Sequence, residues 1–170
     1  GEYMRAKNKQ LLTELLACLK TQAAAVEASG AGDQFISALV SAMAQGQACL
    51  RPQYSGKGLP FIPNKANAIP VGVWLAESAE KVAPLEVLLT AEMSFYWYRA
   101  HQIRGGQVCR FVWHQLKREL IDAFRGRSAR TTSVWIDGRR HQLSGVIIPF
   151  SVLEESQNPQ EIPLLSQETK

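Results

Sequence analysis

The sequence predicts an α+β fold of helices and short β-hairpins, and three observations carry this prediction. Up to residue 46, apolar residues recur at spacings of three and four, which is the period of an amphipathic helix. Prolines and glycines then interrupt the chain up to residue 70, which argues against a helix and permits short strands. Further on, an Asp-Gly pair stands between two β-rich runs, which is the strongest short signal of a β-hairpin.

Two helices are expected at the N-terminal end. The first lies within residues 8–28, and Gly30 and Gly32 end it. The second begins after Asp33, which we expect as its N-cap, and closes at Gly46. The two apolar stripes consist of Leu11, Leu12, Leu15, Leu16, Leu19, Ala23 and Val26, and of Phe35, Ile36, Leu39, Val40 and Met43. The short Gly-rich connection implies a tight helical corner.

The middle of the chain predicts two short strands and a third helix. The strands are expected around Cys49 and around Phe61, with a loop at residues 55–58 between them. Pro70 precedes VGVWLAESAE, which we expect to enter a helix with the proline at or near its first turn. Residues 85–104 combine helix formers with the aromatic run FYWY, so both helix and strand stay open there.

The second half predicts a helix followed by a hairpin. Residues 108–124 place their apolar side chains on or near one helix face, and Gly126 ends this helix. TSVWI and HQLSGVII then flank Asp137 and Gly138, which predicts two antiparallel strands joined by a tight turn. The polar tail after residue 154 is expected to fray or to lie extended.

Helix, corner, helix and then an extended hairpin is the element order of a winged helix. Such a unit can place one helix in the DNA major groove and its hairpin, the wing, against phosphate. We therefore expect a winged-helix-like domain over residues 33–155, with a helical extension over residues 1–32 and a polar tail over residues 156–170. The order occurs twice in imperfect form, over residues 33–82 and over residues 108–149.

The net charge of +4 is distributed unevenly along the chain. Residues 99–141 carry ten basic and three acidic side chains, whereas residues 1–98 are balanced and residues 142–170 are acidic. Such a cluster of cations indicates a surface that faces phosphate, and a solvated helix face followed by a basic loop is the simpler alternative. The candidate DNA-binding residues are Arg110, Lys117, Arg118, Arg125, Arg127, Arg130, Arg139 and Arg140.

The sequence lacks the residue patterns of an enzyme, so we expect no catalytic residue, cofactor or metal. The three histidines stand far apart without metal-ligand spacing, and the SGKG segment lacks two of the residues that define a phosphate-binding P-loop. Tyr96 and Tyr98 are conceivable nucleophiles for DNA cleavage, but no metal-binding histidine cluster accompanies them. We expect the FYWY run in the core, and a base-stacking platform is the functional alternative.

Cysteine usage and hydropathy predict a cytoplasmic protein without a membrane partner. Cys18, Cys49 and Cys109 are odd in number and far apart, which favours three buried thiols in a reducing compartment over a disulfide framework. No apolar run is long enough to cross a bilayer. The first ten residues lack the apolar core of a signal peptide.

Two parts of the chain carry a family resemblance. The first part is FISALVSAMAQGQACLRP followed by GLPFIPNKANAIPVGVWLAE. The second part is the succession of FVWHQLKRELI, VWIDGRRHQLSGVIIP and NPQEIPLL. Both resemble the C-terminal domain of TraI-type conjugative relaxases. These are large proteins of plasmids and integrative elements that nick and transfer DNA. The resemblance covers residues 34–165 and departs from the family pattern in the Ala-rich first helix and at residues 78–107.

The resemblance implies a non-catalytic DNA-binding accessory domain of a conjugative-transfer or mobile-element protein, with DNA and other transfer-complex proteins as partners. It does not imply nicking, because the catalytic part of the family lies in a separate N-terminal region with metal-binding histidines. The alternative is a protein-interaction module that docks through the FYWY region or through the Ala- and Leu-rich first helix, which would expose an apolar stripe to a partner or a second copy.

Overall fold

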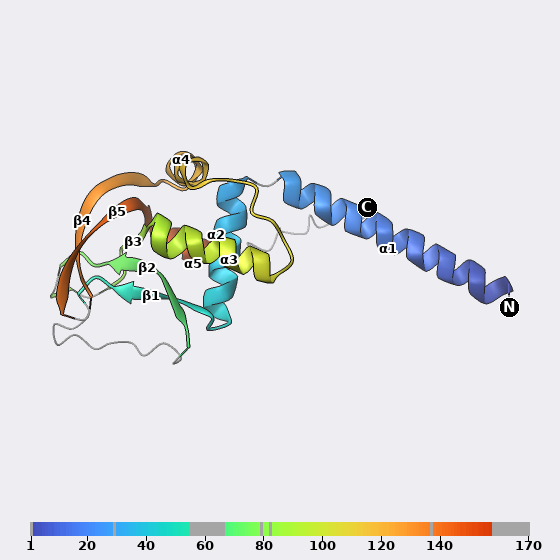
Figure 1. Ribbon diagram of the computed structural model, residues 1–170, viewed down its shortest axis with the longest axis horizontal. Helices are drawn as coiled ribbons and strands as arrows, with labels where there is room; N and C mark the ends of the chain where they lie inside the picture. The colour runs from blue at the N-terminus through green and yellow to red at the C-terminus, as the bar shows by residue number, and fades with distance from the viewer. Residues whose placement is uncertain are drawn as a thin grey trace, which may run out of the picture.

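The computed structural model is an α+β protein built around one five-stranded sheet, which confirms the predicted α+β class (Figure 1). It describes residues 2–28, 30–54, 67–78, 80–81, 83–136 and 138–157. The strand predicted around Phe61, the loop at residues 55–58, Asp137 of the hairpin turn and the tail from residue 158 lie outside the described residues.

The two helices predicted at the N-terminal end are confirmed as α1 (Glu2–Ala28) and α2 (Ala31–Ala44). α1 extends away from the rest of the molecule, whereas α2 packs against the other helices and the sheet (Figure 1). The apolar stripe of α2 is buried. Of the three thiols expected to be buried, Cys49 is buried, Cys109 is half-buried and Cys18 on α1 is exposed, so the expectation is wrong for Cys18 and met only in part by Cys109. Gly46 closes α2 with a φ of 71°, as expected of a C′ glycine.

The N-terminus of α2 receives its cap from a distant residue. Its N-cap position is Gly30, and Asp33 lies inside the first turn, so the predicted N-cap at Asp33 is wrong. The backbone N–H of Gly32 donates instead to Oε2 of Glu119 over 2.7 Å. A Cβ on Gly30 would come within 2.8 Å of the same oxygen, so a glycine leaves room for the carboxylate.

The sheet has the strand order β1-β2-β3-β5-β4, in which β1 and β2 run parallel and the other three neighbouring pairs run antiparallel. The strand predicted around Cys49 is confirmed as β1. The helix predicted after Pro70 is wrong, because these residues form β2, whose last five residues are all buried and therefore read as a continuous apolar run. The strands are β1 (Ala48–Pro52), β2 (Ile69–Leu75), β3 (Glu86–Leu89), β4 (Arg127–Ile136) and β5 (Arg139–Pro149).

Apolar side chains pack on both faces of the sheet, because successive residues of a strand point to opposite faces. One face joins the main core with the helices, and the other carries a smaller cluster. The strand residues of the main core include Val71, Val87, Leu89, Val146 and Ile148, and the smaller cluster consists of Val73, Leu75, Leu88, Ala129, Val134 and Ile147.

The two edge strands of the sheet meet at one end. Tyr54, just past β1, forms a parallel bridge with Trp135 in β4, and the Trp135 N–H donates to the Gln53 carbonyl over 2.6 Å. The Gln53 side chain donates to the Ser133 carbonyl over 3.2 Å and accepts from the Ala76 N–H over 3.3 Å. Together with the curl of the β4–β5 hairpin (Figure 1), these bonds wrap the sheet around the smaller apolar cluster.

Residues 85–104, where helix and strand stayed open, contain both. β3 is followed by a π-helical turn over Ala91–Phe95 and by α3 (Tyr96–Arg104). The Thr90 hydroxyl begins the turn by accepting the Met93 N–H over 3.1 Å. The FYWY run is therefore helical. Phe95, Trp97 and Tyr98 are buried in the main core, as expected, and Tyr96 is exposed.

Tyr98 is the largest fully buried side chain described. Phe35 meets its ring edge-on and Phe111 stacks on it, each with ring centroids 5.4 Å apart. Burial raises the pKa of Tyr98 to about 12, and the nearby Cys109 adds to the rise.

Two further helices complete the fold, α4 (Trp113–Ala123) and α5 (Ser151–Gln157). α4 begins five residues later than the sequence pattern predicts, and residues 107–112 form an irregular approach to it. α5 lies where the sequence predicts the beginning of a frayed or extended tail. None of the helices that the structure describes combines the length and apolarity needed to cross a membrane.

Candidate nucleic-acid interface

α4 lies on the outside of the helical layer. It has an inner face that meets the core and an outer face on the opposite side. Leu116 and Leu120 are fully buried and join the main core, with Trp113 and Phe124 packed partly against it. The helix is amphipathic, as the sequence predicts, so His114, Arg118 and Asp122 face solvent on the other side, while Ile121 still packs partly against the core.

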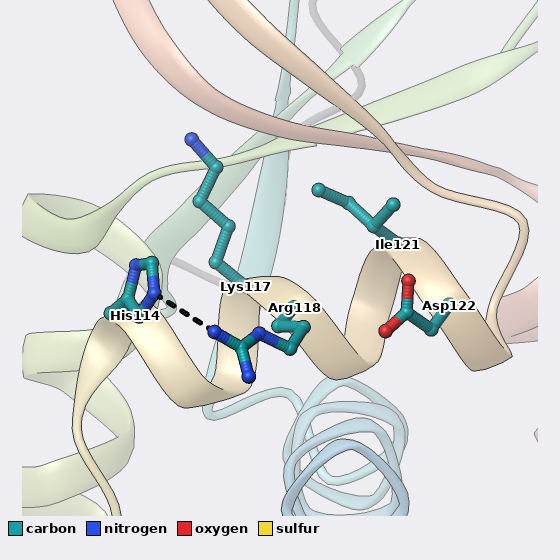
Figure 2. A pocket seen from close by; sticks show the side chains of 5 residues that line it. All are labelled: His114, Lys117, Arg118, Ile121 and Asp122. Carbon is teal, nitrogen blue, oxygen red and sulfur yellow. Dashed lines mark hydrogen bonds between the residues drawn. The ribbon is translucent and has the colours of Figure 1, made fainter.

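We define the α4 outer face as His114, Lys117, Arg118, Ile121 and Asp122, which line a shallow hollow of about 260 Å³ (Figure 2). Spacings of three and four bring these residues together on one side of the helix. The His114 Nε2 and an Arg118 terminal nitrogen are 3.5 Å apart, and Lys117 extends away from this pair (Figure 2). The face therefore presents two cations and an imidazole beside one carboxylate.

The two cations of the α4 outer face have no ion-pair partner among the described residues. Glu119, the other acidic residue of α4, is occupied by the N-terminus of α2. Lys117 is half-buried and Arg118 is exposed. A phosphate that approached this face would not have to displace a carboxylate from either cation.

The arginines just after α4 are paired within the molecule. Arg125 contacts Glu155 of α5 over 3.1 Å, and Arg127 contacts Glu86 of β3 over 2.9 Å. Both arginines are about 60% exposed, and exposed ion pairs contribute little stability. They can still reach solvent, but a phosphate would compete with a carboxylate for each of them.

A tight turn leads from α4 directly into the hairpin. Arg125 adopts a φ of 56°, and the Gly126 N–H donates to the Leu120 carbonyl over 3.0 Å. A Cβ on Gly126 would lie 2.5 Å from that carbonyl oxygen, so only glycine fits without rearrangement. The turn is the reason why β4 starts immediately beside the end of α4.

The predicted hairpin is confirmed, with β4 and β5 paired antiparallel and Gly138 at a φ of 76° in the turn. Arg139 and Arg140 are exposed at its tip, at the opposite end of β4 from α4 (Figure 1). As neighbours in a strand they point to opposite faces, and Arg140 donates two hydrogen bonds to the Ser133 hydroxyl, over 3.1 and 2.9 Å. Arg130 is exposed at an irregularity of β4.

Of the candidate DNA-binding residues, Lys117 and Arg118 thus lie together on one surface, the α4 outer face. Arg110 is exposed in the approach to α4, while Arg130, Arg139 and Arg140 follow the hairpin. Sequence reasoning tested the histidines only for metal-ligand spacing and missed the place of His114 on the α4 outer face. Its spacing of four residues from Arg118 could have indicated it.

A second hollow of about 380 Å³ lies between the end of α4 and α5, and the Arg125–Glu155 ion pair forms part of its lining. Within the described part of the chain, no three His, Cys, Asp or Glu residues are grouped so that they could hold a metal ion. Comparison of the chain with protein-family models, with curated proteins and with solved structures gives no match.

Proposed function

We propose that the chain is a non-catalytic DNA-binding module of the winged-helix type, with α4 as the groove-facing helix and the β4–β5 hairpin as the wing. The order α4, β4, β5 supports this proposal, because a helix followed by a hairpin is the order in which a winged helix presents its groove-facing helix and its wing. β3 lies beside β5 in the same five-stranded sheet. Of the two expected units, 33–82 and 108–149, the proposal rests on the second, since the first adds its strands to the same sheet.

The observation that carries the proposal is the α4 outer face. It is open to solvent at His114, Arg118 and Asp122, its Lys117 and Arg118 form no ion pair with any described residue, and the adjoining turn holds it beside the hairpin. Polyanion binding gains free energy when cations replace the condensed counterions of the phosphates. Residues that give up no internal ion pair on binding contribute most to this gain.

The other candidate residues take graded roles in the proposal. Arg110, Arg130, Arg139 and Arg140 contact backbone phosphates, which orient the protein without reading the base sequence. Arg125 and Arg127 contribute less, because each has to leave Glu155 or Glu86. The resemblance to TraI-type relaxases supports a place for this module in a cytoplasmic conjugative-transfer or mobile-element protein.

The test is a binding titration of the full chain against a short duplex and a single strand of the same length, across a salt series. We expect the affinity to fall steeply with salt concentration. The double variant Lys117→Ala/Arg118→Ala should reduce the slope of log affinity against log salt concentration by about two, one for each lost phosphate contact. The matched control is Lys7→Ala/Lys9→Ala, which removes the same charge from exposed positions of α1.

An unchanged affinity and salt slope in the Lys117→Ala/Arg118→Ala variant, with unchanged helix content, would show that the proposed surface is wrong. An equal loss in the Lys7→Ala/Lys9→Ala control would show that binding follows net charge alone.

For the alternative function, a protein-interaction module, one of the two expected docking surfaces is exposed. The FYWY region is mostly buried in the core and offers little surface to a partner. The apolar stripe of α1, in contrast, is exposed, and this observation favours an interaction role for α1 beside the DNA-binding role of α4.

A further inference from the structure

α1 carries a stripe of large apolar side chains on the outside of the molecule. Their exposed fractions lie between 52% and 60%. The helix extends away from the sheet and the other helices, and none of the other described elements covers the stripe (Figure 1). We define the leucine stripe as Leu11, Leu12, Leu15, Leu16 and Leu19.

The opposite side of α1 is polar, so the leucine stripe is one face of an amphipathic helix. Leucines at spacings of three and four share one side of a helix. The other side satisfies its polar groups locally, since Gln10 donates to Glu14 over 3.1 Å and the Thr13 hydroxyl donates to the Lys9 carbonyl over 2.9 Å. An amphipathic helix without a covering element leaves its apolar face available for a docking partner.

We propose that the leucine stripe docks against the same stripe of a second copy of this chain, as an antiparallel helix pair. A two-fold interface requires one patch that is complementary to itself. Leu15 stands at the middle of the stripe, with Leu11 and Leu19 about one turn away on either side. A two-fold axis beside Leu15 therefore sets Leu11 of one copy against Leu19 of the other, and it keeps the two globular parts at opposite ends.

The charges beside the stripe are compatible with this arrangement. In the antiparallel pair Glu14 of one copy lies level with Leu16 of the other. Lys20 lies level with Gln10 and one residue from the level of Lys9, on the same side of the helix, and both lysines are exposed, so their long side chains can turn apart into solvent. Five half-exposed leucines offer about 100 Å² each, so two copies bury at most about 1,000 Å² together, which is the lower limit for a specific interface.

An amphipathic helix can also bind a membrane surface instead of a second copy. Helices of that kind combine a polar face rich in Lys and Arg with Trp, Phe and Leu on the apolar face. The leucine stripe contains no aromatic residue, and Gln10, Thr13 and Glu14 stand among the lysines on the polar side. These features favour a second copy over a lipid surface.

The test is sedimentation velocity of the full chain over a concentration series, with Leu15→Glu and Thr13→Glu as a matched pair. Both variants add one negative charge to α1, but only Leu15→Glu places it in the leucine stripe. We expect a dimer for the unaltered chain and for Thr13→Glu, and a dissociation constant raised at least about a hundredfold by Leu15→Glu. Leu11→Gln, which adds no charge, should weaken the dimer in the same direction.

Circular dichroism checks that each variant keeps its helix content, and Leu15 lies outside the core, so the globular part should fold in all of them. A monomer at every concentration, or a Leu15→Glu dimer as tight as that of the unaltered chain, would overturn the proposal. Flotation of the monomer with anionic lipid vesicles, lost in Leu15→Glu, would overturn it in favour of a membrane-surface helix.

Discussion

The carboxylate of Glu119, in α4, accepts a hydrogen bond from the backbone N–H of Gly32, at the start of α2, over 2.7 Å. α2 has no side-chain cap from its own N-cap residue, and the positive end of its dipole favours a negative charge at this point. One side chain thereby anchors the proposed DNA-facing helix to the helix behind it.

Replacement of Glu119 tests this cap. We expect Glu119→Ala to lower the free energy of unfolding by about 1–2 kcal/mol, because a backbone N–H and the helix terminus lose their partner. Glu119→Gln should cost less, since its amide oxygen can still accept the bond without the charge. Urea denaturation measures both. Glu80→Ala, at an exposed position outside any helix, serves as a control, and an equal loss there would contradict the capping role.

A glycine in β5 tests how closely β3 and β5 approach one another. A Cβ on Gly145 would overlap the backbone carbonyl oxygen of Leu89, which cannot move without opening the sheet. We expect Gly145→Ala to destabilise the fold by at least about 3 kcal/mol, measured by thermal or urea unfolding. The control is Gly105→Ala, whose Cβ would meet its nearest atom at 3.5 Å. Similar losses in the two variants would show that the approach is not tight.

The Gln53 side chain holds the two edge strands together at one end of the sheet. Gln53→Ala leaves the Ser133 carbonyl and the Ala76 N–H without their partner, so we expect a loss of about 1–3 kcal/mol. Hydrogen exchange should speed up in β4 near Trp135 before it does so in β3. The exposed Gln107→Ala is the control. Unchanged exchange at Trp135 in the Gln53→Ala variant would argue against the role of this side chain.

Tyr98 predicts how stability depends on alkaline pH. Its pKa is raised from 10.0 to about 12, so the unfolded chain loses this proton first as the pH rises. Below pH 10 Tyr98 makes its full contribution to the free energy of unfolding. This contribution is lost between about pH 10 and 12, where the free energy of unfolding falls by about 1.4 kcal/mol per pH unit. In Tyr98→Phe this fall of the free energy of unfolding between about pH 10 and 12 should be absent, whereas Tyr96→Phe, at an exposed position, should keep it. Equal slopes in all three proteins would contradict the assignment.

The elements that the sequence predicts well are those that local patterns define. The stripes of α1 and α2 repeat with the helical period, and both helices form where they are predicted, although α1 begins six residues earlier, at Glu2. Asp137 and Gly138 mark the hairpin because a two-residue turn fixes its own register. In each case the signal lies within a few residues of the structure that it determines.

The rest depends on contacts between distant residues. β2 resembles a helix in sequence because its last five residues are buried on both faces, and burial from both sides erases the alternation that marks a strand. The N-cap of α2 was misassigned because its partner, Glu119, is 87 residues further along the chain. For the candidate site, the sequence indicated Lys117 and Arg118, but not that Arg125 and Arg127 face carboxylates from α5 and β3.

The bridge between Tyr54 and Trp135 also limits how a peptide could extend this sheet. An exposed strand edge can accept an added strand through its backbone N–H and C=O groups. At Trp135 the outer edge of β4 already meets Gln53 and Tyr54. A peptide that lengthened the sheet at β4 would have to lie along its first half, from Arg127, where α4 has just ended. Strand addition at β4 and the proposed binding of DNA would therefore compete for the same side of the molecule.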